Sequence, residues 1–220
     1  MKSYKHKTGV TLMEMLIVVG IIAILAAMVI SLAARIDNQG KEQLVGNTFA
    51  LLNAALGEFR DYGYSYKDSK YSDFDFPLDC DGFRTNELED TLRDASGASS
   101  VSIRGGNHNR YYSGSEALYF FLSKVPESRR TLDKIHRSDK QKTVGSLITN
   151  EDSSGVGLVI RIDDANYPLL RIIDPWGRTL RYDYYDDPNN LDPDEARTFP
   201  VITSAGPDGV FNTLDDITSR

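Results

Sequence analysis

The sequence predicts an α+β protein, in which a long N-terminal helix, membrane-spanning in its first half, packs on a head with a small antiparallel β-sheet. Three patterns predict this fold: an apolar run at the N-terminus, a helical repeat of apolar residues after it, and β-rich segments separated by turns in the last third. With 220 residues, the chain is long enough for one compact domain on a stalk.

The apolar run extends from Val10 to Ala34 and contains one charged residue, Glu14. As a helix it would be about 37 Å long, at about 1.5 Å per residue, which is enough to cross a hydrocarbon core of about 30 Å. Three lysines precede the run and none lies within it, which predicts that the N-terminus is cytoplasmic and the head lies outside.

A carboxylate inside such a run needs a reason, because an acidic residue at the centre of a membrane helix costs about 2.5–3.5 kcal/mol. A secretory signal is one alternative, with a cut near residues 31–33, but its apolar region would be shorter and without charge. A second alternative is a plain single-span anchor with Glu14 near the lipid headgroups.

The residues from Gly9 to Leu16, behind the lysine-rich leader 1–9, resemble the class III signal of type IV pilins and type II secretion pseudopilins. The resemblance implies cleavage after Gly9 by a prepilin peptidase and N-methylation of the new N-terminus, Val10. It also implies that Glu14 meets the N-terminal amine of a neighbouring subunit, where opposite charges neutralise each other in a low-dielectric filament core. The family usually has Phe where this chain has Val10.

Residues 35–62 continue the helix as an amphipathic second half beyond the membrane-spanning, filament-core segment 10–34. Apolar residues recur at steps of three and four, and charged residues fall mostly on the other side. We therefore expect one helix from Val10 to about Asp61, with its apolar stripe packed on the head. The stripe consists of Leu44, Thr48, Leu51, Leu52, Ala55, Leu56 and Phe59.

Residues 63–220 form the predicted head, which completes a type IV pilin-like fold. Its first part, residues 63–156, looks like an insertion relative to the compact secretion pseudopilins, and Ser115 is expected to cap a helix that ends before Pro126. Residues 157–203 are β-rich and predict the sheet. The predicted strands are 157–163, 169–174, 179–185 and 199–203.

The turn that begins at Asp174 reads Asp-Pro-Trp-Gly and leads into the third of these strands. It resembles a turn that opens a strand in the major pseudopilins of type II secretion. Trp176 is predicted to be a core aromatic residue rather than a binding residue.

An acidic loop near the C-terminus, residues 203–217, carries three carboxylates and no basic residue. Such carboxylates repel one another without a cation, and Ca²⁺ takes about six to eight oxygen ligands. The loop is similar to the calcium loop of the major type II secretion pseudopilins; the alternative is a Pro-Asp-Gly turn followed by an exposed acidic pair. The predicted Ca²⁺ ligands are the side chains of Asp208, Asp215 and Asp216, with the backbone carbonyls of Thr203 and Ala205.

Little in the sequence favours an enzyme or nucleic-acid binding. The three histidines lack metal-ligand spacing, and no nucleophile or phosphate-loop motif is present. Loss of the leader with its three lysines changes the net charge from −7 to −10, which disfavours phosphate binding. Cys80 is the only cysteine, so no intramolecular disulfide can form; we expect a small, semi-buried residue, with intermolecular pairing as the alternative.

The resemblance implies a structural subunit, the major pseudopilin of a type II secretion system. Such a subunit leaves the inner membrane and polymerises with itself and with minor pseudopilins, on an inner-membrane assembly platform, into a periplasmic fibre that promotes protein export. One alternative is a pilin or minor pilin of a type IV pilus, acting in adhesion, motility or DNA uptake. Another is a single-span binding protein that never polymerises, which predicts an uncut N-terminus and tolerance of Glu14→Ala.

Overall fold

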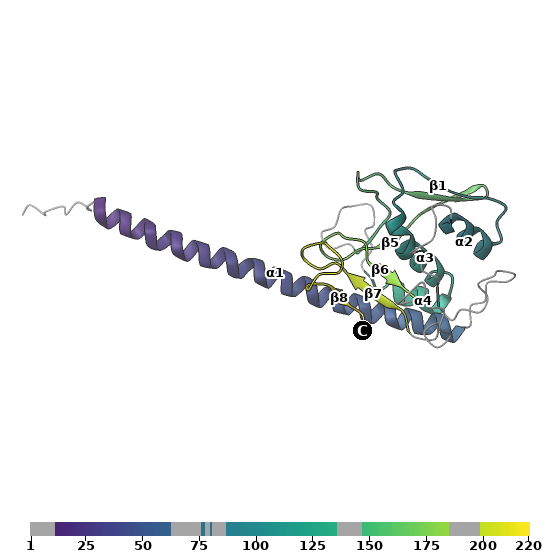
Figure 1. The fold of residues 1–220 in the computed structure, drawn as a ribbon, viewed down its shortest axis with the longest axis horizontal. Coiled ribbons are helices and arrows are strands. Elements are labelled where there is room, and N and C mark those ends of the chain that lie inside the picture. The colour runs from purple at the N-terminus through teal and green to yellow at the C-terminus, as the bar shows by residue number, and fades with distance from the viewer. Residues whose placement is uncertain (1–11, 63–75, 78–79, 81–86, 136–146, 185–198) are drawn as a thin grey trace, which may run out of the picture. The chain divides into compact units, whose positions relative to one another are not determined.

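The computed structural model describes residues 12–62, 76–77, 80, 87–135, 147–184 and 199–220 (Figure 1). The leader, the cleavage position after Gly9 and the new N-terminus at Val10 therefore lie outside the described residues. The chain divides into two compact units, Met1–Lys41 and Glu42–Arg220.

The N-terminal helix α1 extends from Leu12 to Tyr62 and has 51 residues. Its length confirms the predicted continuous helix. In the first unit, the large apolar side chains whose exposure is described are at least half exposed, from Leu12 at 84% to Val18 at 50%. Nothing described in this unit buries them, and an exposed apolar surface of this extent is typical of a membrane or protein interaction site.

The part of α1 that belongs to the second unit buries one face in the head. Val45, Phe49, Leu52 and Phe59 are at most 4% exposed and join the hydrophobic core of the head. Most of the predicted stripe is buried, but Leu44 is exposed and Val45 and Phe49 were not predicted. The stripe is therefore rotated slightly about the helix axis at its start.

The region between the helix and the β-rich segments contains three α-helices and a 3-10 helix among its described residues. α3 is buried along nearly its whole length because it is apolar on most sides. It begins at Ser113, not at Ser115 as predicted, and its N-cap is Tyr112. Pro126 is the first residue of α4, where a proline costs no hydrogen bond. The elements are α2 (Glu87–Ser96), η1 (Arg110–Tyr112), α3 (Ser113–Leu122) and α4 (Pro126–Leu132).

The described strands pair only in antiparallel fashion, which confirms the α+β class, but they form three small sheets rather than one. The sheet orders are β1-β3-β4, β2-β5 and β6-β7-β8. The strands are shorter than predicted because turns interrupt them. Their bounds are β1 (Val101–Arg104), β2 (Ile148–Thr149), β3 (Val159–Ile162), β4 (Ala165–Pro168), β5 (Arg171–Ile172), β6 (Arg181–Asp183), β7 (Val201–Ser204) and β8 (Ile217–Thr218).

The described parts of residues 63–156 contribute to the same core as the predicted sheet region. β1 pairs with β3 in the register Val101↔Ile162, and the core contains Leu92 of α2 together with Phe121 of α3. Within the head, α2, α3 and β1 form one group of elements, while β7 and β8 lie along the last part of α1 (Figure 1). A hydrogen bond of 3.2 Å from the Asn53 amide to the Ser219 carbonyl fixes α1 to the C-terminal segment.

Candidate functional site

The first candidate site is the apolar start of α1. Residues Leu12–Val29 have a mean hydropathy of 2.7, and by length and composition this helix could cross a membrane. Glu14 lies in the first turn of the helix. A carboxylate in the first turn of a helix is favoured by the helix dipole.

The second candidate site is the acidic C-terminal loop, which the structure describes completely. Three residues of the loop have positive φ angles: Gly206 at 60°, Gly209 at 70° and Asn212 at 67°. A Cβ at Gly206 would come within 2.2 Å of the Asp215 carbonyl oxygen, so only glycine fits there. The two ends of the loop are thereby held in close contact.

The three predicted side-chain ligands hold the loop together by hydrogen bonds. The Asp208 N–H donates to Oδ2 of Asp215 at 3.0 Å, and the Asn212 N–H donates to Oδ2 of Asp216 at 2.7 Å. The Thr213 hydroxyl donates to Oδ1 of Asp215 at 2.5 Å. The Thr213 hydroxyl and then the Asp208 N–H hold the pKa of the Asp215 carboxyl below its ordinary value.

Carboxylate and carbonyl oxygens of the predicted ligands line this loop, and Ca²⁺ prefers oxygen ligands. Oδ1 of Asp216 is buried and has no hydrogen-bond partner, so a cation would supply the partner that it lacks. Among the described residues, however, no group of three or more His, Cys, Asp or Glu side chains is arranged to hold a metal ion. A cation would therefore need the predicted backbone carbonyls of Thr203 and Ala205 as well. The Ala205 carbonyl accepts a hydrogen bond from the Gly209 N–H at 3.2 Å, and Thr203 lies in β7.

A cationic side chain of the same head, that of Arg178, lies beside the acidic loop. The Arg178 side chain lies against Gly209, where a Cβ would come within 2.7 Å of Nε. Arg178 directly follows the Asp-Pro-Trp-Gly turn, so this turn and the loop are neighbours in the fold.

A buried carboxylate joins the same two segments, and sequence reasoning missed it. Asp174 is 2% exposed. Its Oδ1 accepts from the N–H groups of Trp176 and Arg178 at 3.0 and 2.9 Å, and its Oδ2 accepts from the Ser204 hydroxyl at 2.7 Å. The Ser204 oxygen in turn accepts from the Gly206 N–H at 3.2 Å. This chain of hydrogen bonds positions the start of the acidic loop.

A second buried carboxylate, Glu116 of α3, is fully buried and was also missed. Its Oε2 lies 2.7 Å from Nε2 of His108. Burial raises the pKa of the Glu116 carboxyl, although the hydrogen bond and charge of His108 and the charge of Arg171 oppose this shift. A charged residue inside the apolar helix Ser113–Leu122 was the available signal.

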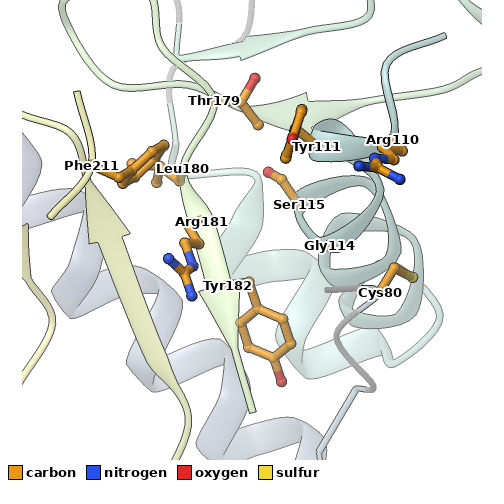
Figure 2. Close-up of a pocket in the computed structure, with 10 residues that line it drawn as sticks. All are labelled: Cys80, Arg110, Tyr111, Gly114, Ser115, Thr179, Leu180, Arg181, Tyr182 and Phe211. Atoms are coloured by element: carbon orange, nitrogen blue, oxygen red, sulfur yellow. The ribbon is translucent and has the colours of Figure 1, made fainter. Parts of the chain in front are cut away.

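A pocket of about 400 Å³ lies between β6, α3 and the acidic loop. Its lining is mainly apolar, and Figure 2 shows Phe211 and Leu180 on one side with Arg110, Tyr111 and Cys80 on the other. Cys80 is 8% exposed, somewhat more buried than the semi-buried residue that was predicted. Trp176 packs partly buried against the core, in agreement with its predicted role.

In a comparison with protein families, residues 4–30 match the family described as prokaryotic N-terminal methylation motif. No curated protein and no solved structure matches the chain significantly. The motif implies processing by a prepilin peptidase and assembly into a pilus-like filament, and it agrees with anchoring in the inner membrane. Together with the α+β head on a long N-terminal helix, the match supports a type IV pilin-like structural subunit.

Proposed function

We propose that the chain is the major pseudopilin of a type II secretion system, which polymerises into a periplasmic fibre and promotes protein export. The observation that carries the proposal is the methylation motif at residues 4–30, with Glu14 in the first turn of α1. The exposed apolar side chains of the first unit support polymerisation, because a filament core would bury them after the subunit leaves the membrane.

The acidic loop is the reason to favour a secretion pseudopilin over a pilus subunit. Its Asp208, Asp215 and Asp216 side chains bind Ca²⁺ in this proposal, with the carbonyls of Thr203 and Ala205. The ion would hold the C-terminal segment in a chain that has a single cysteine and therefore no internal disulfide. The orphaned Oδ1 of Asp216 and the oxygen ligands of the loop support this assignment.

The experiment that tests the proposal is the N-terminal mass of the protein from membranes of its native host. A chain that starts at N-methylated Val10 is the expected result. A chain that starts at Met1 would instead favour a single-span binding protein, and one that starts after Ala33 would favour a secreted protein. Normal fibres from a Glu14→Ala variant would also contradict the proposed pairing with the neighbouring amine.

A pilin or minor pilin of a type IV pilus is the second candidate. The large described region between α1 and β3 favours it, because α2, α3 and α4 add surface that a compact secretion pseudopilin does not need. Deletion of the gene distinguishes the two: loss of exported proteins from the medium supports secretion, and loss of surface fibres with normal export supports a pilus.

A further inference from the structure

Leu214 is the most exposed large apolar residue of the described head, at 108%. The loop that carries it is internally hydrogen-bonded: the Val210 N–H donates to Oδ1 of Asp208 at 2.7 Å, and the Asn212 N–H donates to Oδ2 of Asp216 at 2.7 Å. Leu214 is therefore held outward by an ordered loop. One exposed leucine needs no explanation by itself, so its meaning depends on a complementary surface.

The pocket described above is such a surface on the same head. Its volume of about 400 Å³ lies within the range of about 300–1,000 Å³ that is usual for ligand sites, and its lining is mostly apolar. Phe211, three residues before Leu214, already lines this pocket. Leu214 itself does not line the pocket of its own head, so among the described residues the projecting side chain and the apolar hollow are separate surfaces.

The charges around the two surfaces are complementary. Arg110 and Arg181 line the pocket (Figure 2), and Asp215 and Asp216 directly follow Leu214. Among the described residues, Arg181 also pairs with Asp183 at 2.9 Å, and Arg110 lies over the Tyr111 ring at 5.5 Å. The loop that carries Leu214 holds three carboxylates, which keep one net negative charge even with the proposed Ca²⁺ bound, so it matches an apolar pocket with a basic rim.

We propose that Leu214 of one subunit inserts into this pocket of a second copy of the chain. The inference rests on the proposed function, because a filament places copies of the head side by side. Since the inserted residue and the pocket are different surfaces of one head, the contact can repeat from subunit to subunit without closing, as an open filament requires.

The native cysteine allows a direct test. Cys80 lines the pocket and is the only cysteine of the chain, so a Leu214→Cys variant places the second thiol on the inserted residue. The full chain is produced in its native host, and assembled fibres are treated with a short bismaleimide that joins two thiols. The expected result is a covalent dimer, which is lost in the double variant Leu214→Cys, Cys80→Ser.

The double variant excludes dimers that join two of the introduced thiols to each other, because these would survive the loss of Cys80. The variant Tyr167→Cys is the matched control: Tyr167 is a half-exposed residue of β4 that does not line the pocket, and no dimer with Cys80 is expected. Since Leu214 is fully exposed, Leu214→Ser should fold normally and remain processed at Val10, but should yield fewer fibres.

The same samples separate this inference from the proposed function. Fibres of subunits with methylated Val10 that give no dimer between the thiol introduced at position 214 and Cys80 would overturn the inserted contact and leave the filament role intact. A chain that is not cleaved before Val10 would remove the filament role, and the inserted contact with it.

Discussion

Replacing Asp174 by alanine should destabilise the head more than any exposed acidic substitution, because three donors lose one buried acceptor. The Ser204 hydroxyl is fully buried and cannot exchange Asp174 for water. Its charge-assisted hydrogen bond is worth about 1.5–3 kcal/mol. The two turn N–H groups, of Trp176 and Arg178, are less buried, and their bonds add about 1 kcal/mol each. We expect Asp174→Ala to lower the free energy of unfolding by about 3.5–5 kcal/mol.

A double-mutant cycle isolates the link to the acidic loop. Ser204→Ala and Asp174→Ala are combined in the unit Glu42–Arg220, and urea unfolding is followed by the fluorescence of Trp176, the only tryptophan. The coupling energy should be about 1.5–3 kcal/mol. The matched control is Asp164→Ala, an exposed residue in a surface ion pair with Arg161, which should change stability by less than about 1 kcal/mol. Additive effects of Asp174→Ala and Ser204→Ala would refute the reasoning.

Three further predictions concern the remaining sites. Chelation of Ca²⁺ should lower the Tm of residues 35–220 by about 5–10 °C, because an ion at about 100 times its Kd adds about 2.7 kcal/mol to the free energy of unfolding. Asp215→Ala should abolish this difference, and an unchanged Tm on chelation would argue against the ion. Glu14→Ala should still be cleaved after Gly9 but should assemble poorly, as measured by N-terminal mass and by electron microscopy of fibres. Glu116→Gln should raise the free energy of unfolding above that of the wild type at neutral pH but not at acidic pH, as measured by urea unfolding of both proteins at each pH.

The helix α1 was predictable because both of its patterns are local. The apolar run and the repeat of three and four are visible within a few turns. The repeat alone did not fix which neighbouring residues complete the buried face, so Val45 and Phe49 were missed although both are at most 4% exposed. Their burial depends on the shape of the head, which the sequence pattern does not contain.

The elements of residues 63–156 were mostly not predicted because their stability is not local. β1 has four residues and pairs with β3, so that Val101 and Ile162 are partners across a long separation in the sequence. α4 has seven residues, which is too short to be stable alone. Its Ser128 hydroxyl donates to the Ala55 carbonyl of α1 at 2.8 Å, a contact that forms only in the folded head.

The acidic loop was recognised from spacing, whereas its support was not. Asp208, Asp215 and Asp216 lie within one short segment, but Asp174 and Ser204 are 30 residues apart. Neither residue carries a motif of its own for this contact. Only the folded head shows that the Asp-Pro-Trp-Gly turn and the start of the loop share one buried hydrogen-bond chain.

The pH dependence predicted for Glu116 follows from the direction of its pKa. Burial places the pKa of the folded carboxyl above its ordinary value of 4.5, so the folded state binds this proton more tightly than the unfolded state. The stability from this group is complete below 4.5 and is lost as the pH rises through the raised pKa. The glutamine of the Glu116→Gln variant cannot titrate and keeps an oxygen for a hydrogen bond with His108. The gain from this substitution should therefore appear only above the raised pKa. A gain that is equal at acidic and neutral pH would mean that His108 and Arg171 fully offset the desolvation cost of the buried carboxylate.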